Sequence, residues 1–162
     1  MSAAGQMENL KNTKKVDRKY QWNALTAIGG TVEEVRDGYA RAVLPLTPEV
    51  MQPVAVYHAG AIVTLADEAA SAAIWGGNFE ASADPELLAG KKFPYSVQLS
   101  VNLLTNDARG PITAEARVLK RGRLTIVDTE VRTSDGTLMT TMRSTHMMVD
   151  ASKVGPHLKS TN

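Results

Sequence analysis

The fold of this chain is decided by residues 52–75, which read QPVAVYHAGAIVTLADEAASAAIW. Within this stretch Ile62, Leu65, Ala66, Ala69 and Ala73 recur at intervals of three and four residues, the spacing of one face of an α-helix. We therefore expect one long helix over residues 59–75, ending near the glycines that follow. Because its apolar stripe is mostly alanine, a neighbouring layer can approach this helix closely.

A second stripe of the same helix is polar and contains Thr64, Asp67 and Ser71. Packing does not require a carboxylate on a helix that carries so little charge. Asp67 is therefore the candidate catalytic group. Glu68 lies about 100° further around the helix. We interpret it as a structural residue, and it is the alternative acid if Asp67 is not catalytic.

Two segments before the helix and four after it show strand patterns. Residues 31–35 and 39–46 are joined by Asp37-Gly38, a strong hairpin signal. After the helix, apolar residues alternate with polar ones from residue 95 onward, and the same period of two returns in residues 112–118, 124–131 and 137–149. In residues 124–131 the apolar phase shifts, which indicates a bulge or burial on both faces. The order predicts an α+β fold in which a strongly curved antiparallel sheet wraps around one central helix.

The length of 162 residues fits a single folded domain. We divide the chain into an N-terminal tail with a short docking helix (1–27), the main domain (28–150) and a tail expected to be disordered (151–162). Trp22, Leu25 and Ile28, spaced three apart, predict the docking helix. Residues 78–94 contain mixed charge and prolines and are expected to form a long loop.

Charge, apolar runs and cysteine content exclude several classes of protein. The net charge of +1 lacks the basic excess of a nucleic-acid binder, and no apolar run reaches the ~18 residues of a membrane span. There is no cysteine, so disulfides and thiolate chemistry are excluded. His146 and His157 have no spacing typical of a metal site. We expect a cytoplasmic protein without a metal or redox cofactor.

The central motif resembles that of the hotdog-fold acyl-CoA thioesterases, in particular the phenylacetate-pathway and 4-hydroxybenzoyl-CoA type. That family has Gln or Asn before a His-Gly-Gly and a catalytic acid nine positions after the His. Gln52, His58 and Asp67 match these places, and Ser71 matches a residue often found one turn after the acid. The resemblance covers residues 28–149 and includes the segments 96–103 and 118–123. Ala59 stands where the family has its first glycine.

The resemblance implies hydrolysis of a small or medium acyl-CoA, aromatic ones included, to free acid and CoA. Asp67 would attack the thioester or activate water, and the backbone N–H of Ala59, which alanine retains, would polarise the carbonyl. Gln52 would hold the carbonyl or the water, His58 would orient the helix entry, and Ser71 would hold Asp67 or a water. The substrate-binding candidates are Gly60, Thr64, Arg109, Lys120, Arg121 and Arg123, the basic ones facing the phosphates of coenzyme A.

The family resemblance also implies a homodimer with composite active sites, assembled into a homotetramer, and an acyl-CoA as the small-molecule partner. Two alternatives stay open at this point. One is a hotdog hydratase or dehydratase, which needs a base at the acyl α or β carbon. The other is a module that binds acyl-CoA without turnover.

Overall fold

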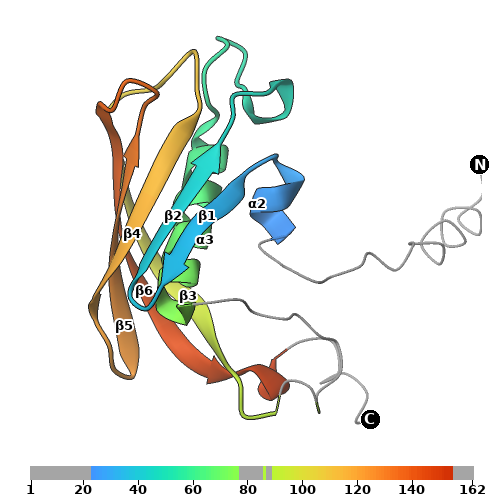
Figure 1. The fold of residues 1–162 in the computed structure, drawn as a ribbon, viewed down its shortest axis with the longest axis vertical. Helices are drawn as coiled ribbons and strands as arrows, with labels where there is room; N and C mark the ends of the chain where they lie inside the picture. The colour runs from blue at the N-terminus through green and yellow to red at the C-terminus, as the bar shows by residue number, and fades with distance from the viewer. Residues whose placement is uncertain (1–22, 77–85, 87–88, 155–162) are drawn as a thin grey trace, which may run out of the picture.

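One long helix and a six-stranded antiparallel sheet dominate the computed structural model, which describes residues 23–76, 86 and 89–154 (Figure 1). In chain order the elements are α2 (Asn23–Ala27), β1 (Thr31–Arg36), β2 (Tyr39–Leu44), η2 (Pro48–Val50), α3 (Ala59–Trp75), β3 (Lys92–Leu103), β4 (Ile112–Lys120), β5 (Leu124–Arg132), β6 (Leu138–Asp150) and η3 (Ala151–Lys153).

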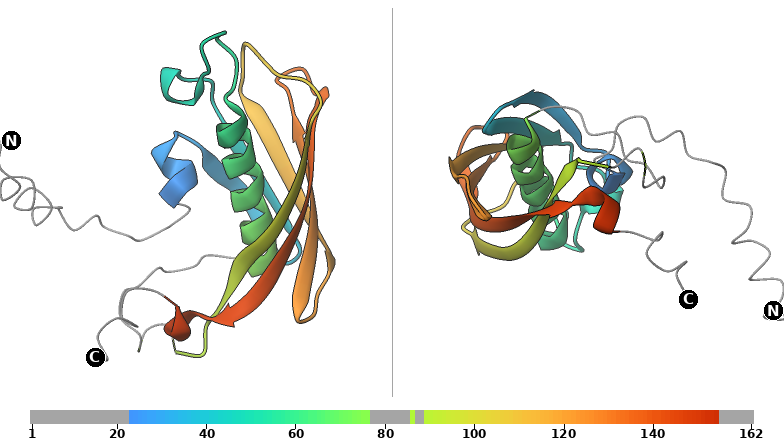
Figure 2. Two further views of the ribbon diagram at one scale, coloured as in Figure 1. Left: turned by 180° about the vertical axis from the view of Figure 1, so that it is seen from behind. Right: turned by 90° about the horizontal axis from the view of Figure 1, so that it is seen from below.

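The strands follow the order β1-β2-β4-β5-β6-β3, so β1 and β3 form the two edges. All neighbouring pairs are antiparallel. The sheet curves around α3, and the helix lies along its concave face (Figure 2). This is the predicted arrangement of a curved sheet around one helix.

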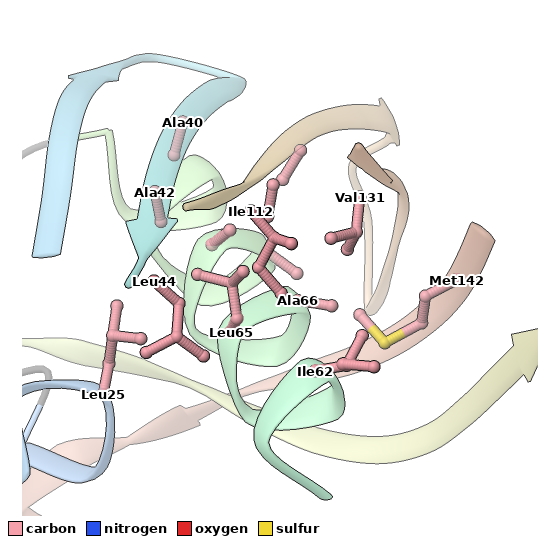
Figure 3. Close-up of a cluster of buried hydrophobic side chains, with 14 of the residues drawn as sticks. Leu25, Ala40, Ala42, Leu44, Ile62, Leu65, Ala66, Ile112, Val131 and Met142 are labelled. Carbon is pink, nitrogen blue, oxygen red and sulfur yellow. The ribbon is translucent and has the colours of Figure 1, made fainter. Parts of the chain in front are cut away.

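Helix α3 has the predicted bounds because both of its ends are capped. His58 is the N-cap residue and accepts a hydrogen bond from the Gly60 N–H, while Gly76 ends the helix with a left-handed φ of 69°. Leu65 and Ala66 point into the core beside Leu44 and Ile112 (Figure 3). The buried alanines keep the helix face flat, which lets all six strands approach it.

In β5 and β3 a simple alternation of apolar and polar residues does not identify the inward face correctly. In β5 the buried residues are Thr125, Val127, Thr129 and Val131, and Leu124 is exposed. The phase shift expected there therefore reflects an apolar residue on the outer face. In β3 the pairing with β6 skips Val97, so the strand carries a bulge between Ser96 and Gln98.

Two segments after α3 differ from the patterns expected of them. Strand β3 begins at Lys92 and includes Pro94, which an edge strand tolerates. At the C-terminus, η3 follows β6, and its Ala151 is buried. Trp22, most of the expected loop 78–94 and residues 155–162 lie outside the described residues. Within the described part, no helix is long and apolar enough to cross a membrane.

Candidate active site

The N-terminus of α3 presents backbone N–H groups beside a histidine cap. The His58 Nδ1 accepts from the Gly60 N–H at 2.9 Å, so that ring nitrogen carries no proton. A side chain at position 60 would press on the imidazole, since an added Cβ would lie 3.1 Å from Nδ1. Among the hydrogen bonds of the described residues, none uses the Ala59 N–H. It is an exposed donor at the positive end of the helix dipole.

A short closed loop places Gln52 beside this helix start. Met51 and Tyr57 form an isolated antiparallel bridge, and the Gln52 N–H donates to the Val56 carbonyl at 2.9 Å. Asn106 holds the same loop from the other side, because its side chain bonds both the N–H and the carbonyl of Tyr57. The backbone of Gln52 is therefore held in the same closed loop that leads into His58 and Ala59.

Asp67 lies on the third turn of α3 and is half-buried. Its Oδ1 accepts a hydrogen bond from the Ser96 hydroxyl at 2.9 Å. Ser71 was expected to hold Asp67 or a water, but among the described residues no hydrogen bond joins Ser71 to Asp67. The hydroxyl of Thr64, on the same stripe of the helix, donates to the Gly60 carbonyl. The candidate acid is thus held by a residue of β3.

Sequence reasoning missed Ser96 because of the bulge. Alternation grouped Ser96 with the outward polar residues of β3, opposite Val97 and Leu99. The extra residue at Val97 reverses this phase, and Ser96 pairs with the buried His146 on β6. The signal that could have found it is the period of two along β6, which puts His146 on the inward face with Met142.

Glu68, the alternative acid, is also half-buried, and its carboxyl has a raised pKa. Burial raises the pKa of its carboxyl to about 7, and the neighbouring Asp67 charge adds to the rise. A carboxyl that titrates near neutrality is a chemically able proton acceptor. The structure therefore gives α3 two adjacent acids in different environments.

The basic candidates lie at opposite ends of α3. Arg109 follows Asn106, close to the helix N-terminus, and pairs with Asp135 at 3.2 Å. Arg121 lies at the other end, where it donates to the Ile74 carbonyl at 3.1 Å and to Asp37 at 2.6 Å.

Lys120 and Arg123, on the same turn between β4 and β5, are exposed. Neither forms a salt bridge to another described residue. One subunit therefore does not bring all four cations to one place.

No group of three or more His, Asp or Glu side chains in the described part of the chain is arranged to hold a metal ion. The described residues offer a backbone N–H at the start of α3 that none of their hydrogen bonds uses, and a carboxylate on the third turn of the same helix. These are the elements that polarise a carbonyl and activate a nucleophile.

The thioesterase superfamily model matches residues 55–140, more than half of the chain. The protein therefore belongs to the thioesterase superfamily, and its fold is the hotdog fold. No curated protein matches the chain.

Solved structures with the same fold include several thioesterases. A conserved Pseudomonas aeruginosa protein aligns with a TM-score of 0.68 and 21% identity, over 84% of this chain and 100% of that one. The PaaI protein of the Escherichia coli phenylacetic acid degradation operon aligns with a TM-score of 0.63 and 18% identity, over 78% and 88%. A hypothetical thioesterase from Streptococcus pneumoniae, solved with coenzyme A, aligns with a TM-score of 0.61 and 15% identity, over 75% and 90%.

Proposed function

We propose that the protein hydrolyses the thioester of a small or medium acyl-CoA, aromatic acyl groups included, to free acid and coenzyme A. The observation that carries this proposal is the unused Ala59 N–H at the start of α3, with a carboxylate on the same helix. In the reaction the carbonyl oxygen gains negative charge, which the N–H and the helix dipole stabilise. The bound coenzyme A of the Streptococcus pneumoniae structure supports this substrate class.

Asp67 provides the nucleophile or the general base of the reaction. Its carboxylate attacks the carbonyl carbon itself, or it takes a proton from the water that does so. In either route the C–S bond breaks, the thiolate of coenzyme A receives a proton, and one water is consumed. A Staphylococcus aureus thioesterase of the same fold was solved with a glutamine and with a glutamate replaced, separated by the same interval as Gln52 and Asp67.

The active site is proposed to form between two subunits. Asp67 follows Ala59 by eight residues, which places it about 12 Å further along the helix axis. A single carbonyl group does not span that distance, because it must accept from the N–H and also lie against the carboxylate. The Ala59 of one subunit therefore works with Asp67 of a second copy.

The edge strand β3 supports such pairing. Val97, Leu99 and Leu103 are 37–49% exposed on this strand, although Leu99 and Leu103 pair with buried residues of β6 and so face inward. An edge strand with exposed apolar side chains on the helix side fits the same edge of a second copy. Assembly of such dimers into a homotetramer is a further prediction that sedimentation tests.

The cation arrangement suggests where the phosphates of coenzyme A bind. Arg121 is already bonded to the Ile74 carbonyl and Arg109 to Asp135, so we assign the phosphates first to Lys120 and Arg123, with Arg109 as the alternative at the other end of α3. Replacing both Lys120 and Arg123 by Met is expected to raise KM for acyl-CoA with little change in kcat. Replacing Arg109 alone is the matched comparison.

The test of hydrolysis is thiol release from a panel of short, medium and aromatic acyl-CoAs, with enoyl-CoA hydration measured in parallel. Asp67→Asn is expected to lower kcat by at least about 10²-fold, whereas the matched control Glu68→Gln retains most activity. Full activity in Asp67→Asn, or hydration without thiol release by the wild-type protein, would show that the assignment is wrong.

The backbone donor can be tested by Ala59→Pro, which removes the N–H. Proline is favoured at the first helical position, and His58 already has the extended conformation, with ψ of 136°, that a residue before proline needs. We expect kcat to fall about 10²- to 10³-fold with the fold intact.

Mixing the Ala59→Pro and Asp67→Asn proteins tests whether the two groups come from different subunits. Random exchange gives mixed dimers that each contain one intact site, so about a quarter of wild-type activity should return. If both groups act within one chain, every site in the mixture stays defective.

A further inference from the structure

A chain of hydrogen-bonded side chains continues behind Asp67 into the core. The Ser96 hydroxyl lies 2.9 Å from the Asp67 Oδ1 and 3.3 Å from the Nδ1 of His146. The other ring nitrogen, Nε2, lies 2.9 Å from the Ser144 hydroxyl. His146 and Ser144 are fully buried on β6, and neither belongs to the family motif on α3.

Counting protons fixes the direction of this chain. The Asp67 carboxylate only accepts, so the single hydroxyl proton of Ser96 is directed to it. The His146 Nδ1 must therefore carry a proton and donate to the Ser96 oxygen. In a neutral imidazole Nε2 then has a lone pair and accepts from Ser144. Every donor in the chain is aimed toward Asp67.

The surroundings of His146 favour this neutral form. Burial lowers the pKa of the imidazole, while the Asp67 charge partly opposes that effect. On the flanking strands His146 pairs with Ser96 of β3 and Thr125 of β5, and neither residue ionises near neutral pH. The acids on the helix side are Asp67 and Glu68.

We propose that His146 and Ser144, acting through Ser96, are positioning residues for Asp67. The inference rests on the proposed role of Asp67 in hydrolysis. With Nδ1 donating, the Ser96 hydroxyl cannot turn away to bond the histidine, and it stays on Oδ1. In the described structure no hydrogen bond ends on Oδ2, so this oxygen is the one presented to the thioester or to water.

The tautomer of His146 tests the inference without any turnover. Nitrogen-15 NMR of the labelled protein should show a protonated Nδ1 and an unprotonated Nε2 for one imidazole, and His146→Asn assigns that signal by its loss. Ser96→Ala should shift part of the proton to Nε2. A His146 signal protonated on Nε2 in the wild-type protein, or a His146 signal that Ser96→Ala leaves unchanged, would overturn the proposal.

Kinetics test the consequence for Asp67. Ser96→Ala and His146→Leu should each lower kcat about tenfold to hundredfold, with KM changed less than about threefold, because only the orientation of the carboxylate is lost. The double variant should be no slower than Ser96→Ala, since His146 acts through Ser96. His146→Asn, whose amide nitrogen can replace Nδ1, should recover most of the rate.

Other results would point to a merely structural histidine. These are additive losses in the double variant, or a His146→Leu protein that is less stable but has unchanged kcat. If His146→Leu does not fold, Ser144→Ala is the replacement, expected to lower kcat a few-fold and to change the tautomer signal. A wild-type protein that releases no thiol from any acyl-CoA would refute the proposed function, while the NMR result would still decide the hydrogen-bond chain.

Discussion

Replacing Asp107 by Asn should destabilise the end of the molecule that holds the active-site loop. Asp107 is 5% exposed, and its Oδ2 accepts from the N–H and the hydroxyl of Ser134 at 2.6 and 2.7 Å. Its Oδ1 accepts from the backbone N–H groups of Arg109 and Gly110. An asparagine side chain keeps an acceptor at the Oδ1 position but presents an NH2 donor to the Ser134 N–H. The bond from the Ser134 N–H is therefore lost and its donor is left unpaired, while the Ser134 hydroxyl can turn to accept from the amide.

The expected loss of unfolding free energy is about 2–3 kcal/mol at pH 7, the cost of leaving the buried Ser134 N–H, which was bonded to a charged group, without an acceptor. Urea unfolding at a fixed protein concentration measures it, because an oligomer's stability depends on concentration. Ser134→Ala, which removes only the hydroxyl bond, is the matched control and should cost about 1.5 kcal/mol.

The pH dependence gives an independent check. Burial acts to raise the pKa of Asp107, but the hydrogen bonds from Ser134, Arg109 and Gly110 outweigh it and hold the pKa well below its usual range. Since the folded pKa is lowered, the stabilisation is complete above about pH 4, the pKa in the unfolded chain. It is lost as the pH falls further, by about 1.4 kcal/mol per unit. A difference between wild type and Asp107→Asn that stays constant from pH 6 to pH 3, or is under 1 kcal/mol at pH 7, would refute the reasoning.

Three further changes test other parts of the structure. Glu68→Gln should raise the unfolding free energy by about 1–2 kcal/mol at pH 8, after allowing for solvent screening, because burial raises the pKa of the Glu68 carboxyl to about 7. The gain should disappear below about pH 4.5, where the carboxyl is neutral in the folded and the unfolded protein. Urea unfolding at both pH values measures the difference. Thr129→Val should stabilise by about 1 kcal/mol, since its buried hydroxyl has no hydrogen-bond partner among the described residues, and a loss of stability on thermal unfolding would contradict this. Arg121→Met removes the donor to the Ile74 carbonyl and should lower stability by about 1 kcal/mol, less at high salt; a salt-independent loss would contradict an electrostatic origin.

Much of the fold follows from local sequence signals. The bounds of α3 were predictable because a polar N-cap and a C-terminal glycine mark its ends, and the Asp37-Gly38 turn likewise fixed the first hairpin. The motif also placed His58 and Ala59 at the start of α3, where the structure has them. These features depend on residues close to one another in the chain.

The remaining features depend on contacts between distant segments. The bond between Arg121 and Asp37 joins residues 84 positions apart, so charge alone could not show that Arg121 is already engaged. The Ser96 contact with Asp67 depends on one unpaired residue in β3. A pattern of alternation assumes a constant phase, and a bulge breaks that assumption without changing composition.

The bulge at Val97 also divides β3 into two parts with separate tasks. Without the bulge, Ser96 would lie on the same face of β3 as Gln98 and Ser100. If Ser96 then faced Asp67, these polar residues would also face inward, in place of Leu99 and Leu103. The extra residue lets the first part of the strand present Ser96 to the helix while the second part presents Leu99 and Leu103. Substitutions on either side of Val97 can therefore alter the chemistry or the apolar surface independently, within a single strand.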